Sequence, residues 1–140
     1  MLQKQFADRK TKKTYIAITV GVPKNDAARI DLPIGRNPSA PSTFRVDAKG
    51  KSAITDYTVL HATDELAMLE LRPYTGRTHQ LRVHTKYMNT PILGDRVYGV
   101  AADRLYLHAK KLEITIPSGD RRTFEAPLPS EFYTHFPAEA

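Results

Sequence analysis

The segment Leu71-Arg-Pro-Tyr-Thr-Gly-Arg-Thr-His-Gln-Leu-Arg-Val-His84 holds more potential chemistry than any other part of the chain. It combines three arginines and two histidines with a glycine turn and the expected start of a helix. A second dense segment follows it, Pro91-Ile-Leu-Gly-Asp-Arg-Val-Tyr-Gly99. We expect the fold and any functional site to be built around these two segments.

The chain as a whole is basic and lacks cysteine. It has 21 Lys and Arg against 15 Asp and Glu, a net charge of +6 and a pI of about 9.6. This charge favours a polyanionic partner such as nucleic acid. The alternative is a basic protein whose charge serves only solubility. The absence of cysteine excludes disulfides and thiolate nucleophiles. No apolar run approaches the roughly 20 residues that span a bilayer, so we expect one cytoplasmic domain with no membrane partner.

Hydrophobic periodicity predicts an α+β fold with a mostly antiparallel mixed β-sheet and few helices. A short helix is expected over residues 2–10, and a long loop with short extended pieces over residues 23–51. The basic residues of that loop (Arg36, Arg45, Lys49 and Lys51) either contact a ligand or are simply solvated. The expected strands cover residues 12–21, 29–34, 53–60, 66–72, 111–117 and 122–126, with the third and fourth forming one hairpin and the last two another, joined by a turn at residues 118–120.

A helix is predicted from about His79 to Tyr87. Thr78 precedes it and is expected to serve as its N-cap, because a threonine hydroxyl can accept from backbone N–H groups in the first turn. Leu81, His84 and Met88 then share one face of the helix.

The histidine spacing argues against a metal site. No two histidines stand four apart with a flanking glutamate, as a helical zinc motif requires. Gly-x-Ser-x-Gly and Gly-x-Gly-x-x-Gly patterns are also absent, and we expect neither metal nor cofactor. Arg77 and Arg82 flank the helix start, where a guanidinium fork suits RNA phosphate or a carboxylate. The alternative is that both are solvated helix residues.

These segments resemble the signature of the RluA-like family of RNA pseudouridine synthases. The similarity extends in the family's order across nearly the whole chain. The residues that carry it are Thr75–His84, Pro91–Gly99, Phe6, Lys12–Ala17, Ile30–Ile34, Gly50–Thr55 and Leu107–Ala109.

The resemblance implies an enzyme that isomerises uridine in ribosomal or transfer RNA to pseudouridine without metal or cofactor, on a nucleotide flipped out of its stack. Tyr15 matches the active-site tyrosine that lies against the target base. Arg82 matches the arginine that pairs with the catalytic aspartate. Arg77, His79 and Gln80 are then expected to bind substrate, and Leu107 to form an apolar wall.

One family motif has no counterpart here. The catalytic aspartate of the family lies in an Arg-Leu-Asp-x-x-Thr-Ser-Gly type motif upstream of the Tyr15 segment, and this sequence contains nothing of that form. We therefore expect residues 1–140 to be the C-terminal portion of a catalytic domain that is inactive alone. The alternatives are a non-catalytic RNA-binding protein and a half-enzyme completed by a second chain that carries the aspartate.

If the strands upstream of this portion are missing, we expect an unpaired strand at the edge of the sheet. Such an edge exposes N–H and C=O groups that can pair with another chain. We therefore expect the isolated chain to form a homodimer or to aggregate through it.

Overall fold

The architecture was obtained as a computed structural model that describes residues 11–115 and 119–136. Its main feature is a six-stranded sheet in the order β2-β5-β6-β1-β7-β8, in which every pairing is antiparallel. The predicted helix over residues 2–10, the strand end at residues 116–117 and Ser118 of the predicted turn lie outside the described residues. The strands of the main sheet are β1 (Lys12–Val20), β2 (Ala27–Asp31), β5 (Ile54–Ala62), β6 (Leu66–Pro73), β7 (Leu107–Thr115) and β8 (Arg121–Glu125).

Strand β1 lies near the centre of the sheet because its side chains are apolar on both faces. Ile16, Ala17, Ile18 and Thr19 are all buried. Successive side chains of a strand point to opposite faces, so both faces of β1 must be covered. The predicted α+β class, with a mostly antiparallel sheet, is confirmed.

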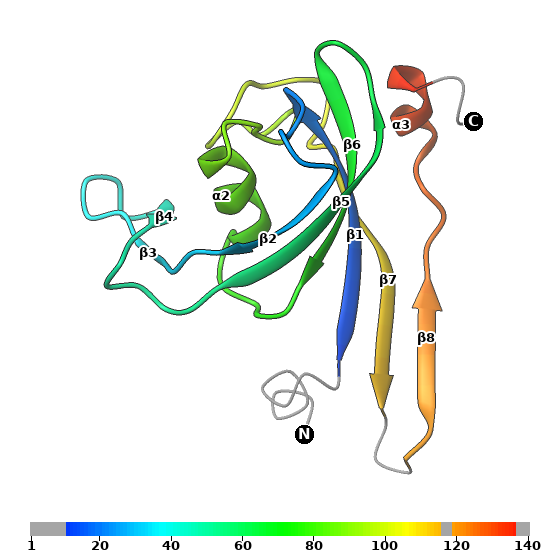
Figure 1. The fold of residues 1–140 in the computed structure, drawn as a ribbon, viewed down its shortest axis with the longest axis horizontal. Coiled ribbons are helices and arrows are strands. Elements are labelled where there is room, and N and C mark those ends of the chain that lie inside the picture. The colour runs from blue at the N-terminus through cyan, green and yellow to red at the C-terminus, as the bar shows by residue number, and fades with distance from the viewer. Residues whose placement is uncertain (1–10, 116–118, 137–140) are drawn as a thin grey trace.

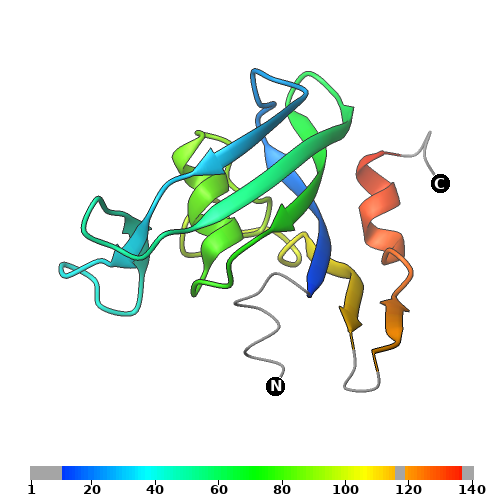
Figure 2. The same ribbon diagram turned by 60° about the horizontal axis from the view of Figure 1, so that its bottom comes forward.

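The two helices of the described residues cover opposite faces of this sheet (Figures 1 and 2). Helix α2 (Gln80–Tyr87) places Leu81 in the same cluster as Ala17. Helix α3 (Ser130–His135) places Phe132 against Ile16 and Ile18. Within the part of the chain that is described, neither helix has the length and apolar character needed to cross a membrane.

Both predicted hairpins are confirmed, as β5–β6 and β7–β8. The predicted loop over residues 23–51 is more regular than expected. The single strand expected over residues 29–34 is interrupted at Pro33, which cannot donate a backbone hydrogen bond. This residue separates β2 from β3 (Ile34–Arg36). Strand β3 pairs with β4 (Phe44–Val46), a strand that we did not predict. This β3–β4 hairpin forms a separate small sheet beside α2 (Figure 1).

The start of α2 also differs from the prediction. The N-cap is His79, in a left-handed conformation with φ 56°, and no side chain caps the helix. Thr78 is exposed and is not the N-cap. The chain enters the helix through a tight turn, in which the Gln80 N–H donates to the Arg77 carbonyl over 3.1 Å. That turn places the Thr78 hydroxyl before the helix start rather than over it.

Candidate active site

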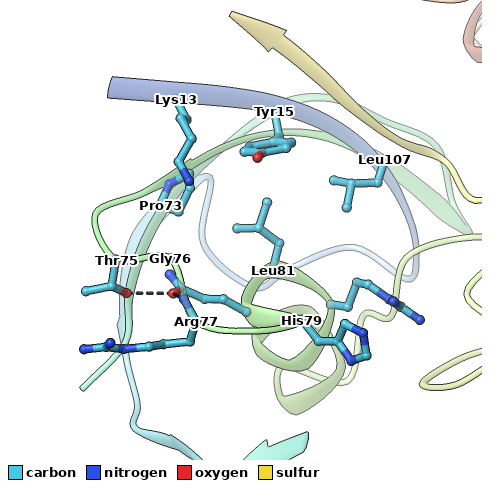
Figure 3. A pocket seen from close by; sticks show the side chains of 11 residues that line it. Lys13, Tyr15, Pro73, Thr75, Gly76, Arg77, His79, Leu81 and Leu107 are labelled. Carbon is cyan, nitrogen blue, oxygen red and sulfur yellow. Dashed lines mark hydrogen bonds between the residues drawn. The ribbon is translucent and has the colours of Figure 1, made fainter. Parts of the chain in front are cut away.

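An open pocket of about 200 Å³ lies between the sheet and the N-terminal end of α2 (Figure 3). Its walls come from β1, the 73–79 loop, α2 and the first residue of β7. Residues distant in sequence therefore meet here. All six side chains that the sequence singled out line this pocket: Tyr15, Arg77, His79, Gln80, Arg82 and Leu107.

The apolar part of the pocket is formed by three residues from three elements. Tyr15 of β1, Leu81 of α2 and Leu107 of β7 face the same space in Figure 3. A register shift between Thr14 and Tyr15 interrupts the β1–β7 pairing at this point, and such bulges redirect side chains. Burial raises the pKa of the Tyr15 phenol, so it stays neutral at physiological pH. An aromatic ring between apolar walls is a surface on which a planar base can stack.

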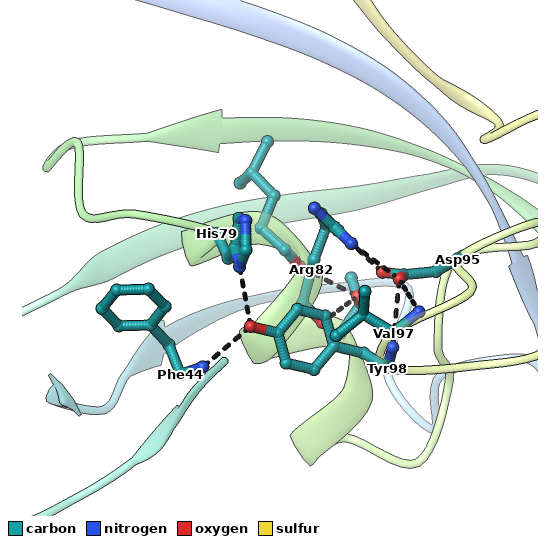
Figure 4. Close-up of polar contacts among 8 residues, drawn as sticks. Phe44, His79, Arg82, Asp95, Val97 and Tyr98 are labelled. Atoms are coloured by element: carbon teal, nitrogen blue, oxygen red, sulfur yellow. Dashed lines mark hydrogen bonds and ion pairs between the residues drawn. The ribbon is translucent and has the colours of Figure 1, made fainter. Parts of the chain in front are cut away.

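Arg82 stands at one side of this pocket and is held by a buried carboxylate (Figure 4). Its Nε donates to Asp95 Oδ2 and its Nη2 to Asp95 Oδ1, each over 2.9 Å. Oδ1 also accepts the backbone N–H groups of Val97 and Tyr98, at 3.1 and 3.0 Å. The Asp95 side chain is 0% exposed. The guanidinium is thus fixed through one edge, and its Nη1 group has no protein partner within the described residues.

The pair is charged at neutral pH. Burial alone would raise the pKa of Asp95, but the hydrogen bonds from Arg82, Tyr98 and Val97 outweigh it and lower the pKa below the ordinary 3.8. The hydrogen bond to Asp95 in turn raises the pKa of Arg82. A bidentate pair of this kind sets the direction of the arginine as well as its charge.

Tyr98 connects this pair to the β3–β4 hairpin. Its ring lies 5.1 Å from the Arg82 guanidinium carbon. Its hydroxyl accepts the Phe44 backbone N–H over 2.9 Å and lies 2.7 Å from His79 Nδ1 (Figure 4). Burial, followed by the nearby charge of Arg82, lowers the pKa of His79. The neutral imidazole can therefore accept the Tyr98 hydroxyl proton at Nδ1.

Gln80 holds the loop before the helix. Its Nε2 donates to the Ile54 carbonyl (3.0 Å) and to Thr55 Oγ1 (2.9 Å). Its Oε1 accepts from Thr75 Oγ1 (2.6 Å) and from the Arg77 backbone N–H (3.0 Å). The amide group of Gln80 is therefore fully engaged, and the residue is only 4% exposed.

His84 extends this network into the core. It is fully buried, with Nδ1 2.8 Å from Thr55 Oγ1 and Nε2 2.9 Å from the Leu32 carbonyl. His79 and His84 thus lie in separate surroundings, and the described residues contain no cluster of three or more His, Asp or Glu that could hold a metal ion.

Among the described residues, the Arg77 side chain makes one hydrogen bond, from Nε to the Ser52 carbonyl over 2.7 Å. This bond ties the 73–79 loop to the segment before β5. The two Nη groups of Arg77 have no partner in the described part of the chain and remain available at the pocket.

Sequence reasoning missed three residues of this site. Lys13 lines the pocket two positions before Tyr15, and the two-residue period of a strand was a signal for it. Asp95 and Tyr98 follow Arg82 by 13 and 16 positions, and no local pattern indicates that they meet it. Only the folded chain places them there.

The site is thus an open pocket with an aromatic and apolar wall beside an arginine that a buried carboxylate holds, in a basic chain. The family profile described as RNA pseudouridylate synthase matches residues 1–87. The chain belongs to this family, which is a family of isomerases.

Curated relatives agree with that assignment. The chain is 42% identical over 137 residues to ribosomal large subunit pseudouridine synthase D of Borreliella burgdorferi, covering 94% of this chain and 42% of the relative. It is also 42% identical over 134 residues to the dual-specificity RNA pseudouridine synthase RluA of Escherichia coli, covering 90% and 61%. The chain thus spans about half the length of these relatives.

Solved structures agree as well. Human RNA pseudouridylate synthase domain containing 1 superposes with a TM-score of 0.78 at 31% identity, covering 89% of this chain and 58% of that one. Human RNA pseudouridylate synthase domain containing 4 superposes with a TM-score of 0.75 at 30% identity, covering 96% of this chain and 64% of that one.

Proposed function

We propose that this chain forms the base-binding part of an RNA pseudouridine synthase that acts on uridine in ribosomal or transfer RNA. In this isomerisation the glycosidic bond from the ribose to N1 of uracil breaks and a bond from the ribose to C5 replaces it. N1 gains a proton and C5 loses one, so the reaction needs no oxidant or co-substrate. The observation that carries the proposal is the meeting of Tyr15, Arg82 and Leu107 in one pocket of a chain from this family.

In this proposal Tyr15 stacks against the flipped uracil and Leu107 closes the apolar wall. Arg82 orients the carboxylate of the catalytic aspartate and keeps it ionised, because a guanidinium favours the charged form of a nearby acid. Its free Nη1 group is the part that can make this contact. Arg77 and His79 contact the substrate at the rim, and Gln80 acts by holding the 73–79 loop in place.

We further propose that the catalytic aspartate comes from outside these 140 residues. In the described part of the chain, no Asp or Glu lines the pocket. The carboxylate nearest to Arg82 is Asp95, which is buried and already accepts four hydrogen bonds. A group held in that way is poorly suited to attack a ribose carbon.

Mass-spectrometric detection of pseudouridine tests this proposal. Ribosomal and transfer RNA would be incubated with the chain alone and with the chain mixed with a polypeptide that carries an Arg-Leu-Asp-x-x-Thr-Ser-Gly motif. We expect pseudouridine only in the mixture or with a gene product that contains both parts. Arg82→Ala should abolish it, and the control Lys24→Ala, at an exposed lysine between β1 and β2, should not. Pseudouridine formed by the chain alone would refute the outside aspartate.

A non-catalytic RNA-binding protein is the second candidate, and it is favoured because no Asp or Glu among the described residues lines the pocket. It predicts that the chain binds RNA at low salt and that Arg77→Ala and Arg82→Glu weaken this binding. It also predicts that no added partner restores isomerisation. A mixture that forms pseudouridine would exclude it. Both candidates imply RNA as the partner and the cytoplasm as the location.

A homodimer through β8 completes the proposal. Among the described strands β8 pairs only with β7, and all five of its residues are exposed, with Phe124 at 55%. Two copies of β8 paired antiparallel about Thr123 would place Arg121 opposite Glu125 of the second copy. Opposite charges at such positions stabilise a strand pair.

A further inference from the structure

A second pocket, of about 240 Å³, lies on the other side of Arg82. Three of its lining residues are arginines, Arg82, Arg96 and Arg104, and its single acid is Asp95. We propose that this arginine pocket binds a phosphate of the RNA backbone next to the flipped nucleotide. The inference rests on the proposed function, because it takes the partner to be RNA.

The charge of the arginine pocket is positive after internal pairing is counted. Three arginines and one aspartate give a net charge of +2, and Asp95 is already neutralised by Arg82. Arg104 also faces Glu131, whose carboxylate is 3.8 Å from Arg104 Nη1 and half exposed. That contact is long and solvated, so an incoming phosphate can compete with it.

Arg104 is fixed before any ligand arrives. Its guanidinium carbon lies 5.1 Å from the ring centre of Phe132 and 5.7 Å from that of Tyr106. Its Nε donates to the Leu105 carbonyl over 3.1 Å. Stacking and one hydrogen bond therefore hold the plane of the guanidinium and leave terminal N–H groups for a phosphate, which arginine binds through two parallel hydrogen bonds.

Arg96 supplies an exposed cationic side chain to the pocket. It is exposed and has no partner among the described residues. Its backbone is nevertheless held, because the neighbouring Asp95 side chain accepts the Val97 N–H. An unpaired arginine on a fixed turn can close on an anion with little loss of other contacts.

The backbone around the pocket is tightly packed. Gly94 N–H donates to the Val100 carbonyl over 3.0 Å, and Tyr106 N–H to the Leu93 carbonyl over 2.9 Å. A Cβ added at Gly94 would lie 1.7 Å from the Arg104 carbonyl oxygen. The two segments that carry Arg96 and Arg104 are therefore in direct contact, and the pocket does not depend on a ligand for its shape.

Arg82 is the shared wall of the arginine pocket and the base pocket. If a base occupied the first pocket, the ribose and phosphates of the same nucleotide would lie close to Arg82. The arginine pocket is thus placed for a backbone phosphate adjacent to the target uridine. Phosphate contacts of this kind set the register of the nucleic acid without reading its sequence.

Fluorescence titrations of the full chain with a labelled RNA stem-loop that carries one loop uridine test this inference. Arg96→Ala and Arg104→Gln should each weaken binding about tenfold at low salt and reduce the slope of log K against log salt by about 0.7 to 0.9. Lys24→Ala, at an exposed lysine between β1 and β2, is the control and should change neither. The loss should be the same when the loop uridine is replaced by cytidine, because a phosphate contact does not read the base.

Inorganic phosphate, added alone and as a competitor of RNA, tells whether the pocket binds an RNA phosphate or free phosphate. Competition by millimolar phosphate for RNA in the parent chain, lost in Arg96→Ala, supports the site. Phosphate binding that depends on Arg96 while RNA affinity does not would overturn the RNA assignment. Equal losses of RNA affinity in Arg96→Ala, Arg104→Gln and the control variant would also overturn the RNA assignment. So would unchanged RNA affinity in Arg96→Ala. If Arg96 controls RNA affinity but no mixture forms pseudouridine, the isomerase proposal fails and the phosphate site stands.

Discussion

At the scale of single residues, the most consequential contact is the one between Arg82 and Asp95. Asp95→Asn keeps the shape of the side chain and removes its charge. We expect the free energy of unfolding to fall by about 3 kcal/mol, the low end for a buried pair, because Arg82 keeps some contact with water. Urea denaturation measures this.

The surface pair Arg29–Asp56 is the matched control for that variant. It is also bidentate, at 2.8 and 3.2 Å, but its arginine is 52% exposed. Asp56→Asn should cost no more than about 1 kcal/mol. Equal losses for the two variants would show that burial of Asp95 does not matter.

His84 makes stability depend on pH. Its burial lowers its pKa below the ordinary 6.5, so the unfolded chain binds this proton more tightly than the folded chain. The contribution of neutral His84 to the unfolding free energy is therefore complete above pH 6.5 and is lost as the pH falls below that value. We expect unfolding free energies from urea titrations to decrease between pH 7.5 and 5.

Two variants test whether His84 causes this pH dependence of the unfolding free energy. His84→Gln should be less stable by roughly 1–3 kcal/mol at pH 7.5, because buried partners lose a hydrogen bond, and its stability should vary less with pH. Thr55→Val removes one partner of His84 and keeps the titrating group, so it should retain the dependence. The same slope in His84→Gln and the parent chain would contradict the assignment.

At the scale of elements, the β3–β4 hairpin depends on one hydroxyl group. Tyr98→Phe removes the acceptor of the Phe44 N–H and leaves the ring in place. One such hydrogen bond contributes about 1 kcal/mol, so hydrogen exchange at Phe44 should become about fivefold faster. Tyr57→Phe, which removes a hydroxyl bonded to the Asn25 carbonyl, should leave Phe44 unchanged. Unaltered exchange in Tyr98→Phe would mean that the hairpin is held by other contacts.

One turn that lines the arginine pocket depends on Gly94. This residue has φ +84° and leaves no room for a Cβ beside the Arg104 carbonyl. Gly94→Ala should therefore lower the melting temperature severely, at a cost of more than about 4 kcal/mol.

Gly119 provides the comparison, because its φ is +90° but nothing lies within 4 Å of an added Cβ. Gly119→Ala should cost only the left-handed strain, about 1–2 kcal/mol. Similar losses for both glycines would show that strain, and not the clash, determines the effect of Gly94→Ala.

At the scale of the whole molecule, the open edge at β8 sets the expected behaviour in solution. We expect light scattering to show a mass that rises with concentration. Thr123→Lys would place two like charges face to face in the proposed pairing and should restore the monomer. Ala62→Lys, at an exposed position of β5, is the control. A monomer at all concentrations in the parent chain would mean that β8 does not self-associate.

Local sequence patterns were sufficient for the strands and hairpins of the main sheet. Alternation and β-branched residues predicted β1, β5, β6, β8 and the second half of β7, because the burial pattern of a strand shows in adjacent residues. The first four residues of β7, from Leu107, were not predicted as strand. These patterns did not give β4, which pairs with β3 and whose Phe44 N–H donates to Tyr98, 54 positions away. Nor did they give the true start of α2, where the turn at His79 overrides the capping preference of Thr78.

The sequence by itself determined the class of fold, the basic charge, the family resemblance and the choice of Tyr15, Arg82 and Leu107, because these follow from residue types and their order. Only the tertiary structure decided that these residues share a pocket, that Asp95 and Tyr98 hold Arg82 there, and that three arginines line a second pocket on the other side of Arg82. Those contacts join side chains many positions apart. Their existence depends on how the sheet and α2 pack, which no local pattern records.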